Sequence, residues 1–229
     1  MKTLISRFAL SVVLFLMLVG CGGKTPAADT LKYNEHARNI VIGGGVNSAE
    51  RNRLWAEDLE YFKNEFPKRH KNPFSVITKE TFNQRMDTLI VKVDKLELHQ
   101  ILVALSEVIA AVGDAHSNIN FFNGYVYPLQ FYAFDGGLYV INADKSLADM
   151  LFARVTKING MDASDVMTRL TAVIPHENKS WVLARLPEYL AWPVYMYGLG
   201  IIPDQVKTVF TMQQNGLERE VTVPINAVK

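Results

Sequence analysis

The sequence has little that would support covalent cross-linking, a metal centre or nucleic-acid binding. Its 229 residues include one cysteine, which excludes an internal disulfide framework and a multi-cysteine zinc site, so stability has to come from a packed core. The 24 Lys and Arg residues balance the 23 Asp and Glu residues, and this near-neutral charge gives no reason to expect nucleic acid as a partner. A hydrophobic fraction of 49% excludes wholesale disorder and predicts one large or two small domains.

The first twenty residues have the order of a secretory signal. A short basic segment precedes the apolar run from Phe8 to Val19, which is too short to be a comfortable membrane span. The run ends in Val19-Gly20-Cys21, which resembles the lipobox of bacterial lipoproteins. The resemblance implies that residues 1–20 are removed and that Cys21 is lipidated, so that the mature protein is extracytoplasmic and anchored to a membrane. An uncleaved signal anchor with an incidental cysteine is the alternative.

Residues 21–46 predict a tether and residues 47–120 a small helical bundle. A capping box of Asn47 and Glu50 is predicted to begin the first helix, and Pro67 to end it. A second helix is predicted to begin at Thr78, and a third to follow Asp94-Lys95-Leu96-Glu97 and to stop at Gly113. The apolar residues expected to face the core are Trp55, Leu59, Phe62, Phe66, Phe82, Met86, Leu89, Val93, Leu98, Ile101, Leu102, Leu105, Val108, Ile109 and Val112.

Residues 121–229 predict a mixed, strand-rich domain with a helical insertion, which makes the fold class α+β. Strands are expected over residues 125–134 and 138–141 around a turn at Asp135-Gly136-Gly137, over 153–158 before Asn159-Gly160, and over 207–212 and 218–225 around Gln214-Asn215-Gly216. Residues 163–173 have helical spacing.

Several segments, in this order, resemble one enzyme family. Trp55 to Leu59, His70 to Phe74 and above all Val112-Gly113-Asp114-Ala115-His116-Ser117 look like the N-terminal helical region of the tail-specific (C-terminal-processing) serine peptidases, which include the tricorn core. Val155 to Asp162 is similar to the strand and turn of their PDZ-like domain. The resemblance covers roughly residues 49–225 and implies a helical bundle followed by a β-rich PDZ-like domain.

The nucleophile of that family is not recognisable. The sequence holds no Gly-x-Ser-x-Gly elbow, and acyl transfer needs a serine held against a base with oxyanion donors beside it. In the family, this serine lies in a domain that follows the PDZ-like segment. The expected function is therefore the non-catalytic N-terminal and peptide-recognition portion of a secreted, lipid-anchored serine peptidase. A stand-alone lipoprotein that binds extended peptides without catalysis is the alternative.

His116 is the residue for which a chemical role can be argued. Histidine titrates near neutral pH and accepts a proton from serine, and Asp114 or Ser117 is close enough in sequence to orient the ring. By resemblance, His116 is a possible general base and Asp114 its orienting residue. A structural cluster at a helix end is the equally weighted alternative.

The PDZ-like resemblance also implies a peptide-binding groove near Gly136 and Gly137, with Leu138 and Val140 on the strand that follows. The expected partners are a polypeptide substrate or peptide terminus and, through the lipid anchor, a membrane. His70, His99 and His176 are isolated in the sequence, so no metal and no cofactor is expected.

Overall fold

The structure is a computed structural model that describes residues 48–119 and 125–227. The predicted signal peptide and tether, Cys21 and Asn47 lie outside the described residues. The chain divides between Asn123 and Gly124 into two compact units. It combines helices with antiparallel sheet, which is an α+β composition. No helix within the described ranges is long and apolar enough to cross a bilayer.

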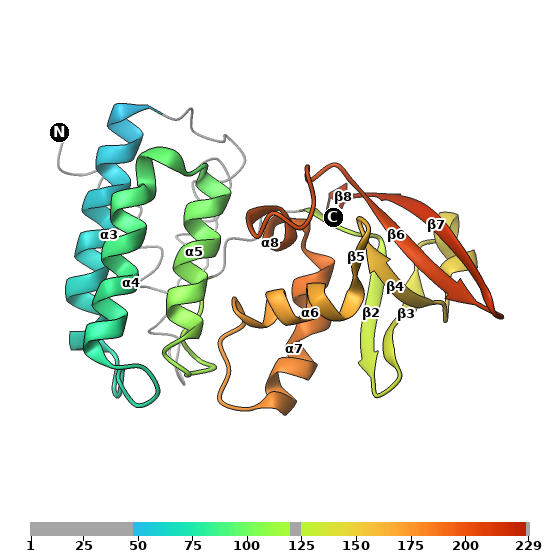
Figure 1. Cartoon of the computed structure of the whole chain (residues 1–229), viewed down its shortest axis with the longest axis horizontal. Coiled ribbons are helices and arrows are strands. Elements are labelled where there is room, and N and C mark those ends of the chain that lie inside the picture. The colour runs from blue at the N-terminus through green and yellow to red at the C-terminus, as the bar shows by residue number, and fades with distance from the viewer. Residues whose placement is uncertain (1–47, 120–124, 228–229) are drawn as a thin grey trace, which may run out of the picture. The chain divides into compact units, whose positions relative to one another are not determined.

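The first unit is helical (Figure 1). Its described elements are α3 (Ala49–Arg69), α4 (Lys79–Lys92), the 3-10 helix η1 (Val93–Lys95) and α5 (Leu98–Ala110). Helix α4 packs on both α3 and α5, and successive helices run in opposite directions (Figure 1).

Side-chain caps determine where these helices begin. The Ser48 hydroxyl accepts a hydrogen bond from the Arg51 N–H at 3.1 Å, so Ser48 caps α3, and the predicted capping box of Asn47 and Glu50 was wrong. Thr78 caps α4, as predicted, by accepting from the Thr81 N–H at 3.1 Å. Glu97 caps α5 together with Gln100, whose side chain accepts from the Glu97 N–H at 2.9 Å.

The apolar stripes of the three helices meet in one core. Phe62, Phe66 and Phe82 are fully buried, with ring centroids 5.0 Å apart for Phe62 and Phe66 and 5.7 Å apart for Phe66 and Phe82. All predicted core residues of this unit are buried except Trp55, which is half-buried. Pro67 does not end α3, which continues to Arg69, because a proline in the last turn removes only one backbone donor.

The second unit combines an antiparallel sheet with α-helices and a 3-10 helix (Figure 1). The sheet runs in the order β2-β3-β4-β6-β7, with β5 paired to β4, and β1 pairs separately with β8. The strands are β1 (Tyr125–Val126), β2 (Leu129–Phe134), β3 (Gly137–Ala143), β4 (Arg154–Ile158), β5 (Met161–Asp162), β6 (Lys207–Gln214), β7 (Leu217–Pro224) and β8 (Asn226–Ala227). The helices are α6 (Ala163–Thr171), α7 (Lys179–Ala191), α8 (Pro193–Gly198) and the 3-10 helix η2 (Lys145–Met150).

Tight turns set the register of this sheet, and the three predicted turns are confirmed. Asn159 and Gly160 have φ values of 49° and 80°, and Asn215 and Gly216 have values of 53° and 78°. Two successive positive φ values define the hairpin turn that matches strand twist, and Asn-Gly is its preferred sequence. Asp135 and Gly136 connect β2 to β3, where Phe134 pairs with Gly137.

The sheet curves around an aromatic core. Phe131 of β2 stacks on Phe210 of β6 at 5.7 Å, although two strands separate β2 from β6 in the sheet order. Tyr127 packs edge-on against Phe210 at 5.2 Å, and its hydroxyl forms a hydrogen bond with Thr208. Helix α7 packs on both α6 and β2, so the predicted helical insertion is part of the packed second unit.

One carboxyl group in the helical unit is buried among apolar side chains. Asp58 of α3 is 6% exposed, next to the fully buried Leu59. Burial raises the pKa of Asp58 to about 7, and the negative charge of Glu57 adds to the rise. The folded state therefore keeps a proton that the unfolded state, with an Asp pKa of about 3.9, releases.

We expect the free energy of unfolding to fall as the pH rises from about 4 to about 7, because a raised carboxyl pKa stabilises the fold only while the group is protonated. Asp58→Asn should remove roughly 1–3 kcal/mol of this pH dependence. Urea unfolding at pH 4.5 and pH 8 measures it, with the exposed Glu60→Gln on the same helix as control. If the free energy of unfolding changed equally between the two pH values in wild type and in Asp58→Asn, Asp58 would not be the group with the raised pKa.

Candidate functional site

The candidate site begins where α5 ends. The helix closes at Ala110, and the Gly113 N–H donates to the Ala110 carbonyl at 3.1 Å. Gly113 has a φ of +76°, and a Cβ placed there would lie 2.6 Å from Cγ2 of Val76. Both the left-handed backbone and the close approach of Val76 require glycine at this position. This turn directs the chain into Asp114.

The Asp114 carboxylate accepts four hydrogen bonds. Its Oδ1 accepts from the His116 backbone N–H at 2.9 Å and from His116 Nδ1 at 3.2 Å. Its Oδ2 accepts from His70 Nε2 at 2.7 Å and from the Ser117 hydroxyl at 2.9 Å. The carboxylate therefore joins three side chains, one of them from a segment more than 40 residues earlier in the chain.

These hydrogen bonds keep Asp114 ionised. Partial burial of the carboxyl group by itself raises its pKa, but the donors from His116, His70 and Ser117 outweigh that effect and lower the pKa to about 2. At neutral pH the group is a carboxylate that only accepts hydrogen bonds, so every partner must present a proton to it.

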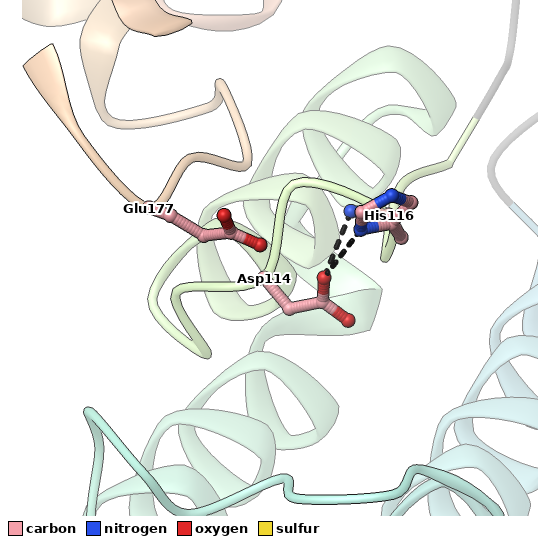
Figure 2. Close-up of side chains that lie close together, drawn as sticks. All are labelled: Asp114, His116 and Glu177. Atoms are coloured by element: carbon pink, nitrogen blue, oxygen red, sulfur yellow. Dashed lines mark hydrogen bonds and ion pairs between the residues drawn. The ribbon is translucent and has the colours of Figure 1, made fainter.

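His116 is held by its Nδ1 and presents most of its ring to the surface. Figure 2 shows both contacts from His116 to Asp114, one from the backbone and one from the ring. Because Asp114 accepts at Nδ1, a neutral His116 carries its proton on Nδ1 and its lone pair on Nε2. The side chain is 90% exposed, so the ring contributes little to the core.

His70 has the opposite arrangement. Its Nδ1 accepts from the Asn72 backbone N–H at 3.1 Å, while its Nε2 faces Asp114. A neutral His70 therefore carries its proton on Nε2, and its side chain is only 11% exposed. With the Nδ1 lone pair engaged by Asn72, His70 has no donor atom left for a metal ion in this arrangement.

Ser117 supports the carboxylate rather than the imidazole ring. It is 3% exposed, and its hydroxyl donates to Asp114 Oδ2. This geometry differs from the expectation that Ser117 could orient His116. A buried hydroxyl with its proton engaged is also poorly placed to attack a substrate.

Sequence reasoning missed His70, which is isolated from Asp114 in the sequence. Asp114 and His116 are two residues apart, a spacing that suggests contact, whereas His70 lies in a different segment. The contact arises because α3, which ends at Arg69, and α5, which ends at Ala110, both pack on α4, and the segments that follow them meet. No local sequence pattern shows this. The only sequence signal was that both segments belong to the family resemblance.

The candidate peptide-binding residues lie around the β2–β3 turn. Leu138 and Val140 are fully buried, and their strand β3 pairs with β2 on one side and with β4 on the other. Their side chains are thus inaccessible to a bound peptide, and their strand has no open edge beside them. Gly136 and Gly137 lie at the turn, where Phe134 pairs with Gly137.

A cavity of about 460 Å³ lies at the opposite end of these two strands. Leu129 pairs with Ala143 at this end, and both line the cavity together with Tyr127, Asp144 and Ala191. The cavity therefore does not include the four candidate peptide-binding residues.

We expect acid to weaken the fold through Asp114. A carboxyl whose folded-state pKa is depressed to about 2 stabilises the fold above the unfolded-state pKa, and this stability is lost as the pH falls from about 4 to about 2. Asp114→Asn should remove roughly 1–2 kcal/mol of this loss. Urea unfolding at pH 5 and pH 2.5 tests it against Glu80→Gln, an exposed acid on α4. An unchanged acid response would mean that Asp114 is not the acceptor described above.

Two comparisons with known protein sequences found no match to this chain. No family model matches the chain, and no curated protein matches it. The resemblance to the tail-specific peptidases therefore stays a prediction, and the function has to be argued from the Asp114 cluster and from the sheet.

Proposed function

We propose that this chain is the helical and polypeptide-recognition part of a serine peptidase of the tail-specific type, with Asp114 and His116 as its proton-transfer pair. The observation that carries the proposal is the contact between Asp114 Oδ1 and Nδ1 of the exposed His116 ring. A carboxylate on Nδ1 is the arrangement that places the imidazole lone pair on Nε2, where a general base needs it.

A purely structural cluster accounts for His116 less well. His70 and Ser117 are buried or nearly so, and their bonds to Asp114 already tie the two segments together. The backbone N–H of residue 116 would bond Asp114 whatever its side chain were. The exposed ring is therefore the part of the cluster that packing does not require.

In the proposed reaction, Nε2 of His116 takes the proton of a serine hydroxyl as the oxygen attacks a peptide carbonyl. Asp114 keeps the ring in the required tautomer and stabilises the imidazolium that forms. Ser117 is not the nucleophile, because its hydroxyl is buried and donates to Asp114. The proposal therefore leaves the attack to another serine.

The second unit would recognise the polypeptide through a PDZ-like sheet. Its order of strand β4, Asn159-Gly160 turn, β5 and helix α6 supports that part of the proposal. A PDZ-like domain binds an extended chain as an added strand at a sheet edge. In keeping with the secretory signal and lipobox, we propose that this takes place outside the cytoplasm on a lipid-anchored protein.

A stand-alone polypeptide binder without catalysis is a second candidate, and the contrast between the two sheet edges favours it. Strand β7 carries Glu218, Arg219 and Glu220 and ends at Pro224, features that block edge pairing. Strand β2, the other terminal strand, has no charged residue and no proline. Although α7 packs on β2, Gln130, Tyr132 and Phe134 stay exposed.

We expect the two histidines that bond Asp114 to have opposite tautomers at pH 8. Long-range ¹H–¹⁵N NMR should find the proton of His116 on Nδ1 and that of His70 on Nε2. Asp114→Asn should move His116 toward the Nε2–H form, which dominates in free imidazole side chains, while His70 keeps its bond from Asn72. A wild-type His116 protonated on Nε2 would remove the base from the proposal.

We expect an unfolded polypeptide such as carboxymethylated casein to slow hydrogen exchange in β2 and not in β7. Placing a charge on the receptive edge with Tyr132→Lys should weaken binding at least about tenfold, since lysine blocks edge pairing. The matched change Thr222→Lys, at an exposed position of β7, should have little effect. Fluorescence anisotropy measures the affinities. Protection confined to β7, or equal effects of the two lysines, would contradict recognition at β2.

A further inference from the structure

We propose that the outer face of the β2–β3 hairpin docks a polypeptide segment that carries an acidic side chain next to apolar ones. The surface consists of Tyr132, Phe134, Tyr139 and Arg154, called here the hairpin patch. The inference rests on the proposed polypeptide recognition. It adds where the polypeptide would bind and which side chains it would carry.

Three aromatic rings of the hairpin patch cluster on the solvent side of the sheet. The ring centroids of Tyr132 and Phe134 are 4.5 Å apart, and those of Phe134 and Tyr139 are 5.7 Å apart. Tyr132 is 47% exposed and Phe134 54% exposed. The alternate residues Phe131 and Leu138 face the core, so these rings are not needed to fill it.

Arg154 adds a positive charge to the rings. It lies on β4 directly opposite Tyr139 of β3. Its Nε lies 2.8 Å from where a Cβ on Gly137 would be, so the guanidinium lies across the end of the hairpin, over Gly137. Glycine at this position, with a φ of +127°, leaves the space that the guanidinium occupies.

The Arg154 charge is not neutralised within the described residues, where no carboxylate forms an ion pair or hydrogen bond with it. Arg219, on β7, differs: its guanidinium donates to the Asp149 carboxylate at 2.6 Å. Asp135 in the turn is the acidic residue nearest to the hairpin patch in sequence, and it forms no such pair with Arg154. An exposed guanidinium on the strand next to these rings is complementary to a carboxylate flanked by apolar groups.

Backbone strain at Phe152, between β3 and β4, supports a binding role for this side of the sheet. Phe152 lies two residues before the start of β4 and donates its N–H to the Val140 carbonyl of β3 at 2.8 Å. It has a φ of 65°, which is rare for a bulky residue, and its side chain is 71% exposed. Packing does not require a phenylalanine at this strained position, and exposed aromatic rings are common anchors of interfaces.

An acidic polypeptide segment fits the rings and the charge of the hairpin patch. Tyr, Phe and Arg are side chains that interfaces use as anchors, and a guanidinium prefers a carboxylate that binds it with two hydrogen bonds. We therefore commit to a Glu or Asp side chain of an extended partner as the group that meets Arg154, with apolar neighbours on the three rings.

The test uses the full chain and two labelled decapeptides with amidated C-termini, one alternating Glu with Leu and Phe, the other with Gln in place of Glu. The acidic peptide should bind at least about tenfold more tightly in fluorescence anisotropy. Arg154→Gln should abolish that difference, and Phe134→Ala should weaken both peptides. Arg219→Gln, which removes a paired cation at the other edge of the sheet, should leave the preference intact. Circular dichroism confirms that each variant is folded.

Equal affinity for the two peptides, or an unchanged preference in Arg154→Gln, would overturn the inference. If casein still protects β2 in that case, polypeptide recognition survives and only the hairpin patch is wrong. A preference that appears only when the peptide has a free C-terminal carboxylate would also overturn the inference, because the anion would then come from a chain terminus. Sedimentation that shows a dimer lost in Phe134→Ala would identify a second copy as the occupant instead.

Discussion

The Asp114 carboxylate is the interaction on which the functional reading of the first unit depends. Its donors come from His70, which directly follows α3, and from His116 and Ser117, which follow Asp114 after the end of α5. An acceptor that is saturated in this way stays ionised and fixes the position of every proton around it. One anion thereby connects the packing of two helices to the orientation of an exposed imidazole ring.

Much of the secondary structure could be predicted, because its determinants are local. Thr78 and Glu97 cap their helices, and Asn159-Gly160 and Asn215-Gly216 impose turns through their own backbone preferences. Two local predictions failed: α3 continues past Pro67, because its last turn tolerates a proline, and Trp55 is only half-buried, because burial depends on tertiary packing. The curvature that brings Phe131 onto Phe210 joins strands far apart in sequence, and no periodicity shows it.

In the candidate site, too, local sequence predicted some features, and others depend on tertiary structure. The proximity of Asp114 and His116 follows from their spacing, but the contribution of His70 requires two helix ends to meet. On the sheet, alternation places Leu138 and Val140 in the core and leaves Tyr139 on the solvent side, so the sequence pattern identified the hairpin but not its accessible face. Arg154 of β4 lies over Gly137 of β3, in space that any side chain larger than glycine would fill. This contact between neighbouring strands is also absent from any local sequence pattern.

The unequal edges of the sheet also limit how copies of this protein can associate. Growth of a β-fibril requires each subunit to offer two receptive strands, one for the preceding subunit and one for the next. In the described β2-β3-β4-β6-β7 sheet, the charges and the proline of β7 block one edge, and β2 is the receptive edge. Two molecules that joined through β2 would use up both receptive strands and form a closed pair, so assembly would stop at the dimer rather than continue into a polymer.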